Sequence, residues 1–311
     1  MVPLRLRIED SFFLPEERDG YWVSAEMKKV WAVELDLLNA FAQVCSEYHL
    51  KWFAHAGTML GAVRHHGFIP WDDDIDVMMP RDDYNRLIEI GPQVFSSPYF
   101  LQNEESDHFF CRVFSRLRNS DTTAIQIREK EYCFPYNQGI FIDIFPLDNI
   151  PDNQIELTPF LDQIHFYESH EWIMRNMVHF YRPKKGKGLS KRLNYYLKHI
   201  WFKYFARREG DYKELLRAHV ELMTAYNKSE TQRIGEIVIS PLGRHIWEKE
   251  WLLSPVYVPF EMLSIPIPIG YNQCLTASYG EDWQSPKQQG NYHGQIIFDT
   301  NRPYTEYLNN N

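Results

Sequence analysis

The order of apolar and polar positions in the first hundred residues predicts alternating helices and strands. From Ser24 to His49, apolar side chains recur every three or four residues, which predicts a long amphipathic helix with Ser24 as its N-cap. A short strand is predicted over 50–57 and a short helix over 58–67. The apolar run "IDVMM" (75–79) predicts a buried strand, and a further helix follows Pro80.

The next segments are rich in the residues that are typical of strands. Residues 109–118 and 122–127 predict a hairpin with its turn at 119–121. Residues 139–148, "GIFIDIFPLD", predict a further strand with one acid, Asp143, inside an apolar run. An unpaired carboxylate there would be costly, so a nearby metal ion explains Asp143 better than a simple buried acid does.

The pattern becomes helical, basic and aromatic from 156 to 234. Residues 171–217 contain 13 Lys and Arg but only 4 Asp and Glu. Aromatic residues are interleaved with the cations. One interpretation is a solvated helical face, and the other is a surface for a phosphorylated or membrane-attached partner.

Composition and charge narrow the class of protein. The hydrophobic fraction of 44% and aromatic fraction of 15% indicate a folded globular protein, and the net charge of -9 argues against nucleic-acid binding. The four cysteines are far apart, which indicates neither a cysteine zinc site nor a disulfide framework. No apolar run approaches the ~20 residues of a spanning helix, and the N-terminus lacks a signal-peptide pattern. We therefore expect a cytoplasmic protein, with peripheral membrane contact left open.

The stretch "FIPWDDDIDVMMPRDDY" (68–84) holds the most informative chemistry, since four aspartates fall within five positions next to an apolar strand. In a strand, Asp74 and Asp76 would project to the same side, and Asp72 would continue this row if the chain is extended there. Asp73 would then point elsewhere. Carboxylates arranged in this way can hold a hard divalent cation such as Mg²⁺, with Mn²⁺ as the alternative.

Other interpretations of the acidic stretch fit less well. An EF-hand loop would have Val77 where glycine is required and Asp83 where glutamate is required. The two carboxylates of a glycoside hydrolase normally lie on different elements. A solvated turn remains open, although the flanking residues are apolar.

Gly57 and Thr58 precede the short predicted helix at 58–67. Free backbone N–H groups at a helix start can hold a phosphate, and Gly57 allows close approach of the backbone. Thr58 adds a hydroxyl, and Arg64, followed by His65 and His66, could reach an anionic ligand.

The stretch "AGTMLGAVRHHGFIPWDDDIDVMMPRDDY" resembles the signature of the LicD family, which includes bacterial phosphocholine transferases and, more distantly, fukutin-type transferases. The resemblance is dense over 49–87 and recurs at 139–151 and 258–286. This family belongs to the nucleotidyltransferase-fold superfamily, recognised by a glycine–threonine or glycine–serine turn, a pair of acids and a third acid on a later strand. The sequence departs from the pattern at His55 and Ala56, where small residues are common, and Asp73 occupies a tolerant position.

The resemblance implies transfer of a substituted phosphate, most simply phosphocholine, from CDP-choline or another CDP-alcohol to a sugar hydroxyl of a cell-surface glycan. That glycan would be a teichoic acid, a lipopolysaccharide or a capsule precursor. Asp74, Asp76 and Asp143 would be the catalytic acids, and together with Asp72 they would bind Mg²⁺. Asp143 would either complete the metal site or take the proton of the acceptor hydroxyl.

Further residues are expected around the donor. Gly57 and Thr58 would hold its phosphate. Its negative charge would be met by cations, for which the candidates are Arg64, Arg112 and Arg116. A transferred quaternary ammonium group would favour an aromatic box, for which the candidates are Trp71, Tyr279 and Trp283.

We expect an α+β fold with a nucleotidyltransferase-like mixed sheet flanked by helices. Residues 1–150 would form the catalytic core, 151–235 a basic helical insertion, and 236–311 the part that completes the catalytic domain. The partners would be the CDP-alcohol, a glycan or lipid-linked glycan acceptor and, through 171–217, the inner face of a membrane.

Two functions of other classes remain. A true nucleotidyltransferase would use the same triad but attack the other phosphorus and transfer the nucleotide. A non-catalytic glycan- or membrane-binding module would carry a degenerate metal site, and the intact Asp74, Asp76 and Asp143 argue against it.

Overall fold

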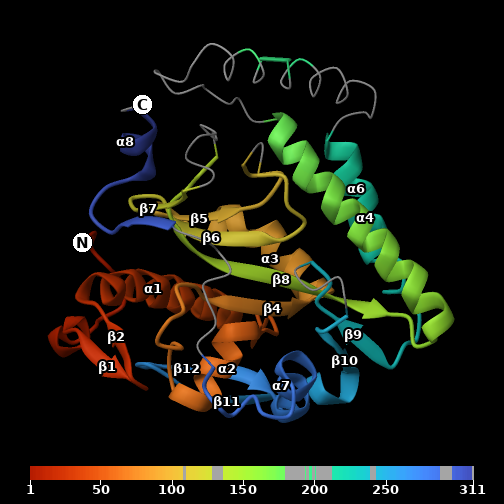
Figure 1. Cartoon of the computed structure of the whole chain (residues 1–311), viewed down its shortest axis with the longest axis horizontal. Helices are drawn as coiled ribbons and strands as arrows, with labels where there is room; N and C mark the ends of the chain where they lie inside the picture. Colours follow the sequence, from red (N-terminus) through yellow and green to blue (C-terminus); the bar gives the residue numbers. More distant parts are fainter. Residues whose placement is uncertain are drawn as a thin grey trace.

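A mixed β-sheet forms the centre of the protein, with helices packed around it (Figure 1). The computed structural model describes residues 1–107, 110–127, 136–178, 212–238, 243–287 and 296–309, together with positions 193, 196, 197 and 200. The longest path through the sheet runs in the order β10 (Ile246–Glu248), β9 (Arg233–Gly235), β8 (Ile140–Ile150), β4 (Asp76–Pro80) and β3 (Phe53–Ala54). The predicted α+β class is thereby confirmed.

Strand β8 is the central strand of the sheet. It pairs in parallel with β4 and antiparallel with β6 (Ser115–Asn119), which in turn pairs with β5 (Tyr99–Gln102). Its last residues pair with β9. Since β8 is apolar and buried over nearly its whole length, it is covered on both faces, as its sequence predicts.

The first long helix, α1 (Ala25–Glu47), packs against β6 and β8. The Ser24 hydroxyl accepts a hydrogen bond from the backbone N–H of Met27 (3.1 Å), so the predicted N-cap is confirmed. The helices predicted after it are also present, as α2 (Ala56–His65) and α3 (Arg81–Val94). Helix α1 supplies much of the core, and its Trp31 and Leu35 are fully buried.

The hairpin predicted over 109–127 is wrong. Strands β6 and β7 (Thr123–Gln126) do not pair with each other. Both edges of β6 are occupied, by β5 and β8, and β7 instead pairs with β13 (Ile296–Asp299) near the C-terminus. The turn at 119–121 is present as predicted. The strand after it, β7, pairs with the distant β13 and not with β6.

Helices α4 (Gln154–Val178) and α6 (Tyr212–Met223) lie side by side at one end of the sheet (Figure 1). They enclose a second small apolar cluster, which includes Ile150 from the end of β8. Most of the basic block at 171–217 lies outside the described residues. Within the described part of the chain, no helix is long and apolar enough to cross a membrane.

The C-terminal region returns to the core. A two-stranded sheet, β11 (Pro255–Phe260) with β12 (Leu263–Pro268), lies next to α2 and β3, and α7 (Tyr271–Tyr279) packs on α2. A small hairpin near the N-terminus, β1 (Glu16–Arg18) with β2 (Tyr21–Val23), precedes α1. A short 3₁₀ helix (Asp10–Phe13), another at Lys249–Leu252 and a final helix, α8 (Tyr304–Asn309), complete the described elements.

Candidate active site

The turn between β3 and α2 presents the start of a helix to the acidic segment. Ala56 adopts a left-handed backbone conformation (φ 44°), which costs a non-glycine residue about 1 kcal/mol. The hydroxyl oxygen of Thr58 accepts a hydrogen bond from the backbone N–H of Asp76 (2.8 Å). Thr58 therefore fastens the beginning of α2 to the first residue of β4, while its own hydroxyl hydrogen is available to donate.

Gly57 is required by the close approach of Asp72. A Cβ atom built on Gly57 would lie 2.5 Å from Oδ2 of Asp72, closer than real contacts allow. One carboxylate of the acidic segment thus lies directly on the glycine of the turn. The two sequence features that indicated phosphate binding and metal binding are parts of one site.

The geometry of the four aspartates differs from the predicted row. Strand β4 begins only at Asp76, so residues 72–75 lie outside the strand and its alternation of side chains does not have to hold for them. Carboxylate oxygens of Asp72, Asp73 and Asp74 all lie within 4.8 Å of one another. The expectation that Asp73 points elsewhere is wrong, because the irregular backbone brings it into the cluster.

Asp76 and Asp143 lie side by side on neighbouring parallel strands, directly paired in register. Asp143 is also opposite Arg116 on β6, and the guanidinium binds its carboxylate in a bidentate manner (Nε–Oδ1 2.5 Å, Nη2–Oδ2 3.2 Å). Three strands therefore carry a row of Asp76, Asp143 and Arg116 across one face of the sheet. The predicted third acid, Asp143, therefore lies beside Asp76 and is held by a cation.

A sixth carboxylate, which the sequence reasoning missed, approaches this site from α1. Glu34 is 1% exposed, and its Oε2 atom is buried without a hydrogen bond to any described residue. Burial, together with the negative charges of Asp74, Asp73, Asp72 and Asp76, raises the pKa of Glu34 well above its usual range. The only signal in the sequence is an acid on the apolar face of an amphipathic helix, about forty positions before its neighbours.

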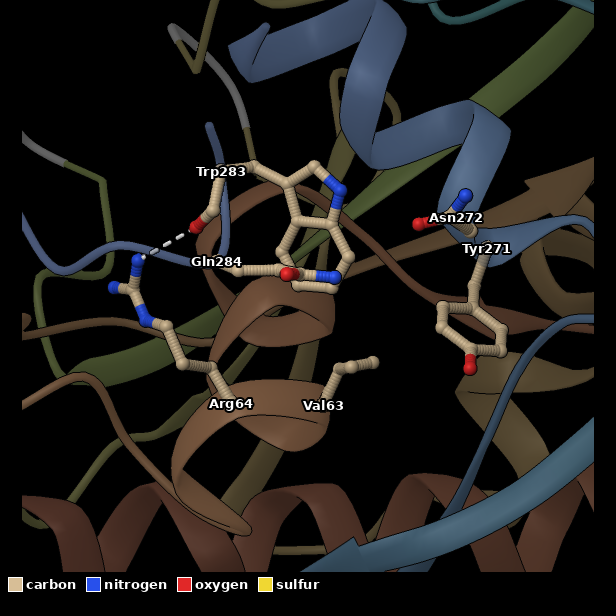
Figure 2. A pocket seen from close by; sticks show the side chains of 6 residues that line it. All are labelled: Val63, Arg64, Tyr271, Asn272, Trp283 and Gln284. Atoms are coloured by element: carbon tan, nitrogen blue, oxygen red, sulfur yellow. Dashed lines mark hydrogen bonds between the residues drawn. The ribbon is translucent and has the colours of Figure 1, made fainter. Parts of the chain in front are cut away.

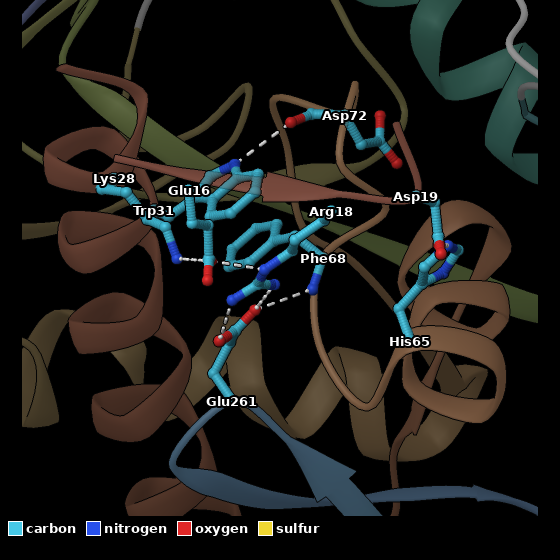
Figure 3. A network of polar contacts seen from close by, with 9 residues as sticks. All are labelled: Glu16, Arg18, Asp19, Lys28, Trp31, His65, Phe68, Asp72 and Glu261. Atoms are coloured by element: carbon cyan, nitrogen blue, oxygen red, sulfur yellow. Dashed lines mark hydrogen bonds and ion pairs between the residues drawn. The ribbon is translucent and has the colours of Figure 1, made fainter. Parts of the chain in front are cut away.

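The loop that carries Asp72 is fixed by a network of aromatic and charged side chains (Figure 3). Trp31 of α1 donates its indole N–H to the carbonyl of Asp72 (3.1 Å) and stacks on Phe68 (centroids 4.5 Å apart). Arg18 lies over Trp31 and forms a bidentate pair with Glu261 (2.5 and 3.0 Å). Segments from three distant parts of the chain therefore hold this loop.

The three candidate phosphate-binding arginines lie in different surroundings. Arg64, near the end of α2, donates to the carbonyl of Trp283 (3.0 Å), and burial lowers its pKa. Arg112 precedes β6 and lies over the ring of Phe114 (5.4 Å). Arg116 is paired with Asp143. Arg64 lines a pocket.

That pocket has a volume of about 330 Å³ between α2 and α7 (Figure 2). Its lining residues are Val63, Arg64, Tyr271, Asn272, Trp283 and Gln284. Figure 2 shows the Trp283 ring facing the pocket from the segment after α7. The pocket thus offers one cation, one large aromatic face and two amides.

The proposed aromatic box is spread over two places. Trp283 lines the pocket. Burial and the charges of Asp72, Asp76 and Asp74 raise the pKa of Tyr279, which belongs to the end of α7. The Trp71 ring instead packs edge-on against Tyr21 (6.1 Å) and His65 (6.4 Å).

The acidic cluster fits a hard divalent cation. Asp72, Asp73 and Asp74 offer oxygen ligands, the type that Mg²⁺ prefers, and these oxygens are close enough to share one ion. The buried, unpaired Oε2 atom of Glu34 adds an acceptor on the α1 side. Asp76 follows directly, and Asp143 lies next to it.

The sequence was compared with protein-family models and with known proteins. Residues 49–185 match the family model described as "LicD/FKTN/FKRP, nucleotidyltransferase domain". The chain is therefore similar to the LicD family over this segment. The lipopolysaccharide cholinephosphotransferase LicD of Haemophilus influenzae is 26% identical over 265 residues, which are 82% of this chain and 90% of that protein. An uncharacterized protein of Rickettsia prowazekii, RP689, is 29% identical over 131 residues, 39% of this chain and 47% of that protein.

The LicD match covers the turn, the acidic segment, β8 and α4. It does not reach α1, which supplies Trp31 and Glu34, or α7 and the segment after it, which line the pocket. The candidate site is therefore larger than the LicD-family segment.

The contact between Gly57 and Asp72 gives a stability prediction with a change of sign. Gly57→Ala should destabilise the protein by about 1–3 kcal/mol, because the added methyl collides with the Asp72 carboxylate. In an Asp72→Gly background the same change should be neutral or stabilising by about 0.5–1 kcal/mol, because alanine favours a helix over glycine. Denaturant unfolding of all four proteins in the cycle measures the coupling. Equal effects in both backgrounds would contradict the collision.

Glu34 gives a pH-dependent prediction. Below its unfolded pKa of about 4.3, Glu34 is protonated in both the folded and the unfolded protein, so its contribution to stability is fully present. As the pH rises toward and through the raised folded pKa, the unfolded protein loses this proton more readily than the folded one, and the contribution is lost. Without divalent cations, Glu34→Gln should therefore be more stable than the wild type at neutral pH, by about 1 kcal/mol or more, with the gap closing toward about pH 4. Glu47→Gln, an exposed acid on the same helix, is the control and should show no such gap. A gap that is flat with pH would exclude a buried, charge-crowded Glu34.

Proposed function

We propose that this protein transfers phosphocholine from a CDP-linked donor to a sugar hydroxyl of a cell-surface glycan, with Mg²⁺ bound at the acidic cluster. The observation that carries the proposal is the contact of Asp72 with Gly57, joined to the Thr58–Asp76 hydrogen bond. Together they set a group of metal-binding carboxylates against the N-terminus of α2. A diphosphate bridging the two would meet a cation on one side and backbone N–H groups on the other.

The broader class rests on the relatives. The likeness to a lipopolysaccharide cholinephosphotransferase extends over 82% of this chain and includes the turn, the acids and Asp143, so the chain is a transferase of phosphorus-containing groups. Choline as the transferred alcohol and lipopolysaccharide as the acceptor are taken from that relative's name. Teichoic acid and capsule precursors remain further acceptor candidates, and Mn²⁺ remains the alternative cation.

The reaction would proceed by attack of the acceptor oxygen on the phosphorus that carries choline. The bond from this phosphorus to the bridging oxygen breaks, and CMP leaves. A cation bound by the acids would neutralise charge on the diphosphate oxygens. The first backbone N–H groups of α2, up to that of Thr58, and the Thr58 hydroxyl would hold phosphate oxygens in line for attack.

The remaining side chains have separate tasks in this proposal. Asp143, oriented by Arg116, would take the proton of the acceptor hydroxyl. Arg64 and Trp283 would receive the outer part of a substrate in the pocket between α2 and α7. The Trp283 face suits a quaternary ammonium group.

Nucleotidyl transfer is the alternative reaction at the same acids. It would leave the nucleotide on the acceptor and release phosphocholine from CDP-choline, or pyrophosphate from CTP. The products thus distinguish the two reactions, whichever acceptor is used.

Incubation of the protein with Mg²⁺, purified lipopolysaccharide and a panel of CDP-alcohols tests the proposal. We expect CMP release and choline on the glycan, and we expect Asp74→Asn and Asp76→Asn each to lower the rate by at least about 100-fold without unfolding the protein. Asp82→Asn is the matched control, since Asp82 is exposed in the first turn of α3. A fully active Asp74→Asn/Asp76→Asn double variant would refute the proposal, and release of phosphocholine instead of CMP would favour nucleotidyl transfer.

Membrane contact through 171–217 is a further part of the proposal. The four described positions of this block that carry exposed apolar side chains are spaced as one helix face: Leu193, Tyr196, Leu197 and Ile200. Lysines and arginines surround them in the sequence. An interfacial helix of this kind would bring the enzyme to a lipid-linked acceptor.

Sedimentation with vesicles that contain anionic lipid tests this contact. We expect binding at low salt that weakens at high salt, and a loss of at least about fivefold for Leu197→Glu. Leu253→Glu, which changes an exposed leucine (71%) elsewhere on the surface, should leave binding unchanged. Equal binding by both variants would rule out this helix face as the contact.

A further inference from the structure

Two histidines and a glutamate from three separate segments meet beside the glycine–threonine turn. His55 lies between β3 and α2, Glu236 follows β9, and His245 precedes β10. Ligand atoms of all three lie within 4.8 Å of one another. His55 and Glu236 are fully buried, and the side chain of His245 is 13% exposed. The transfer reaction proposed above uses none of these three residues, which we call the His–Glu–His cluster.

The pairing of β9 with β10 brings Glu236 and His245 together. Gly235 is opposite Ile246 in this antiparallel pair, and the backbone N–H of Glu236 donates to the carbonyl of His245 (2.9 Å). The two residues therefore continue the ladder as opposed positions, and their side chains point to the same side. His55 completes the cluster from the neighbouring end of β3.

The Glu236 carboxylate is aimed at both histidines. Its Oε1 atom accepts the backbone N–H of Val238 (2.5 Å), which fixes the orientation of the group. Its Oε2 atom lies 2.9 Å from Nδ1 of His245 and 3.5 Å from Nε2 of His55. One oxygen is thus anchored to the backbone and the other lies between two imidazoles.

His55 is the residue that a hydrogen-bonded network does not explain. Both of its ring nitrogens are buried: Nδ1 has no hydrogen-bond partner among the described residues, and Nε2 has there the long 3.5 Å contact with Glu236. Its ring is surrounded edge-on by the rings of Phe145 (5.6 Å) and Trp247 (5.8 Å). A buried polar atom without a partner costs about 1–3 kcal/mol, so Nδ1 and the long contact of Nε2 on one ring require an explanation.

A metal ion between the three side chains supplies that explanation. Zinc binds histidine nitrogen and carboxylate oxygen at about 2.0–2.2 Å, so its ligand atoms are about 3.3–3.5 Å apart in a tetrahedral site. The 3.5 Å between His55 and Glu236 fits this spacing, and the 2.9 Å between His245 and Glu236 would widen by a few tenths of an ångström. Two imidazoles and one carboxylate form a ligand set that zinc commonly uses.

We propose that His55, Glu236 and His245 bind a Zn²⁺ ion, with a fourth position open on the side of His245. This site differs in chemistry from the acidic cluster, where all ligands are hard oxygens suited to Mg²⁺. The two sites would therefore select different metals.

The zinc ion would join parts of the chain that the α4–α6 segment separates. His55 precedes α2, and its backbone N–H donates to the carbonyl of Asp76 (3.0 Å). Zinc would fix this residue against the β9–β10 hairpin, which follows α6. It would hold the start of α2, and with it Gly57 and Thr58, in place without touching a substrate.

Metal analysis of untagged, full-length protein tests the proposal. We expect roughly one zinc per chain after dialysis against excess Mg²⁺. His55→Gln and His245→Gln should each weaken zinc binding at least about tenfold. Asp74→Asn and His219→Gln, the latter at a buried histidine that lies outside the His–Glu–His cluster, should keep the zinc.

Cobalt substitution gives a readout that does not depend on folded variants. Stripped wild-type protein loaded with Co²⁺ should develop the visible absorption of a tetrahedral site, and Zn²⁺ but not Mg²⁺ should abolish it. Absence of this band in the wild type would overturn the proposal. Retention of zinc by a folded His245→Gln variant, or its loss in Asp74→Asn, would also overturn it.

Discussion

Keeping six carboxylates close together is the constraint on which the rest of this structure depends. Two unit charges 4.8 Å apart repel by roughly 3 kcal/mol at the effective dielectric of a protein surface, and Asp72, Asp73 and Asp74 are at least that close. Such a segment does not hold its shape unaided. The structure holds it through the backbone, where the Trp31 indole donates to the Asp72 carbonyl and the Thr58 hydroxyl accepts the Asp76 N–H. These two hydrogen bonds to the backbone help to hold the acidic segment in place despite the repulsion between its carboxylates.

The sequence alone predicts most elements whose character is local. Helix α1 begins after Ser24 as expected, and β8 has the buried, apolar character that its residues indicate. The residue types of the acidic segment predict a group of carboxylates, and three of them do lie together. The geometry of this segment was not predicted, because the alternation of a strand was applied to residues 72–75, which lie before β4 begins. Asp73 joins the cluster for this reason.

Features that depend on distant partners could not be predicted. A pattern of turn residues cannot tell that β7 pairs with β13 rather than with β6. Likewise, Glu34 and Arg116 reach the acids only through the packing of α1 and the order of strands around β8. His55 was noted only as a departure from the family pattern, and its neighbours Glu236 and His245 lie nearly two hundred residues later. Each of these is a statement about tertiary structure, for which a single sequence offers no periodic signal.

The contacts of Trp31 show that the candidate site is supported by residues that precede the family match. The family match starts at residue 49, yet the indole that holds Asp72 and the arginine that lies over it come from residues 31 and 18. A fragment that begins at the family boundary would lose both, together with Glu34, and the acidic loop would close over a void instead of a packed helix. The family match covers the turn and the acids of the candidate site. The smallest piece of chain able to keep them in place extends back to the β1–β2 hairpin.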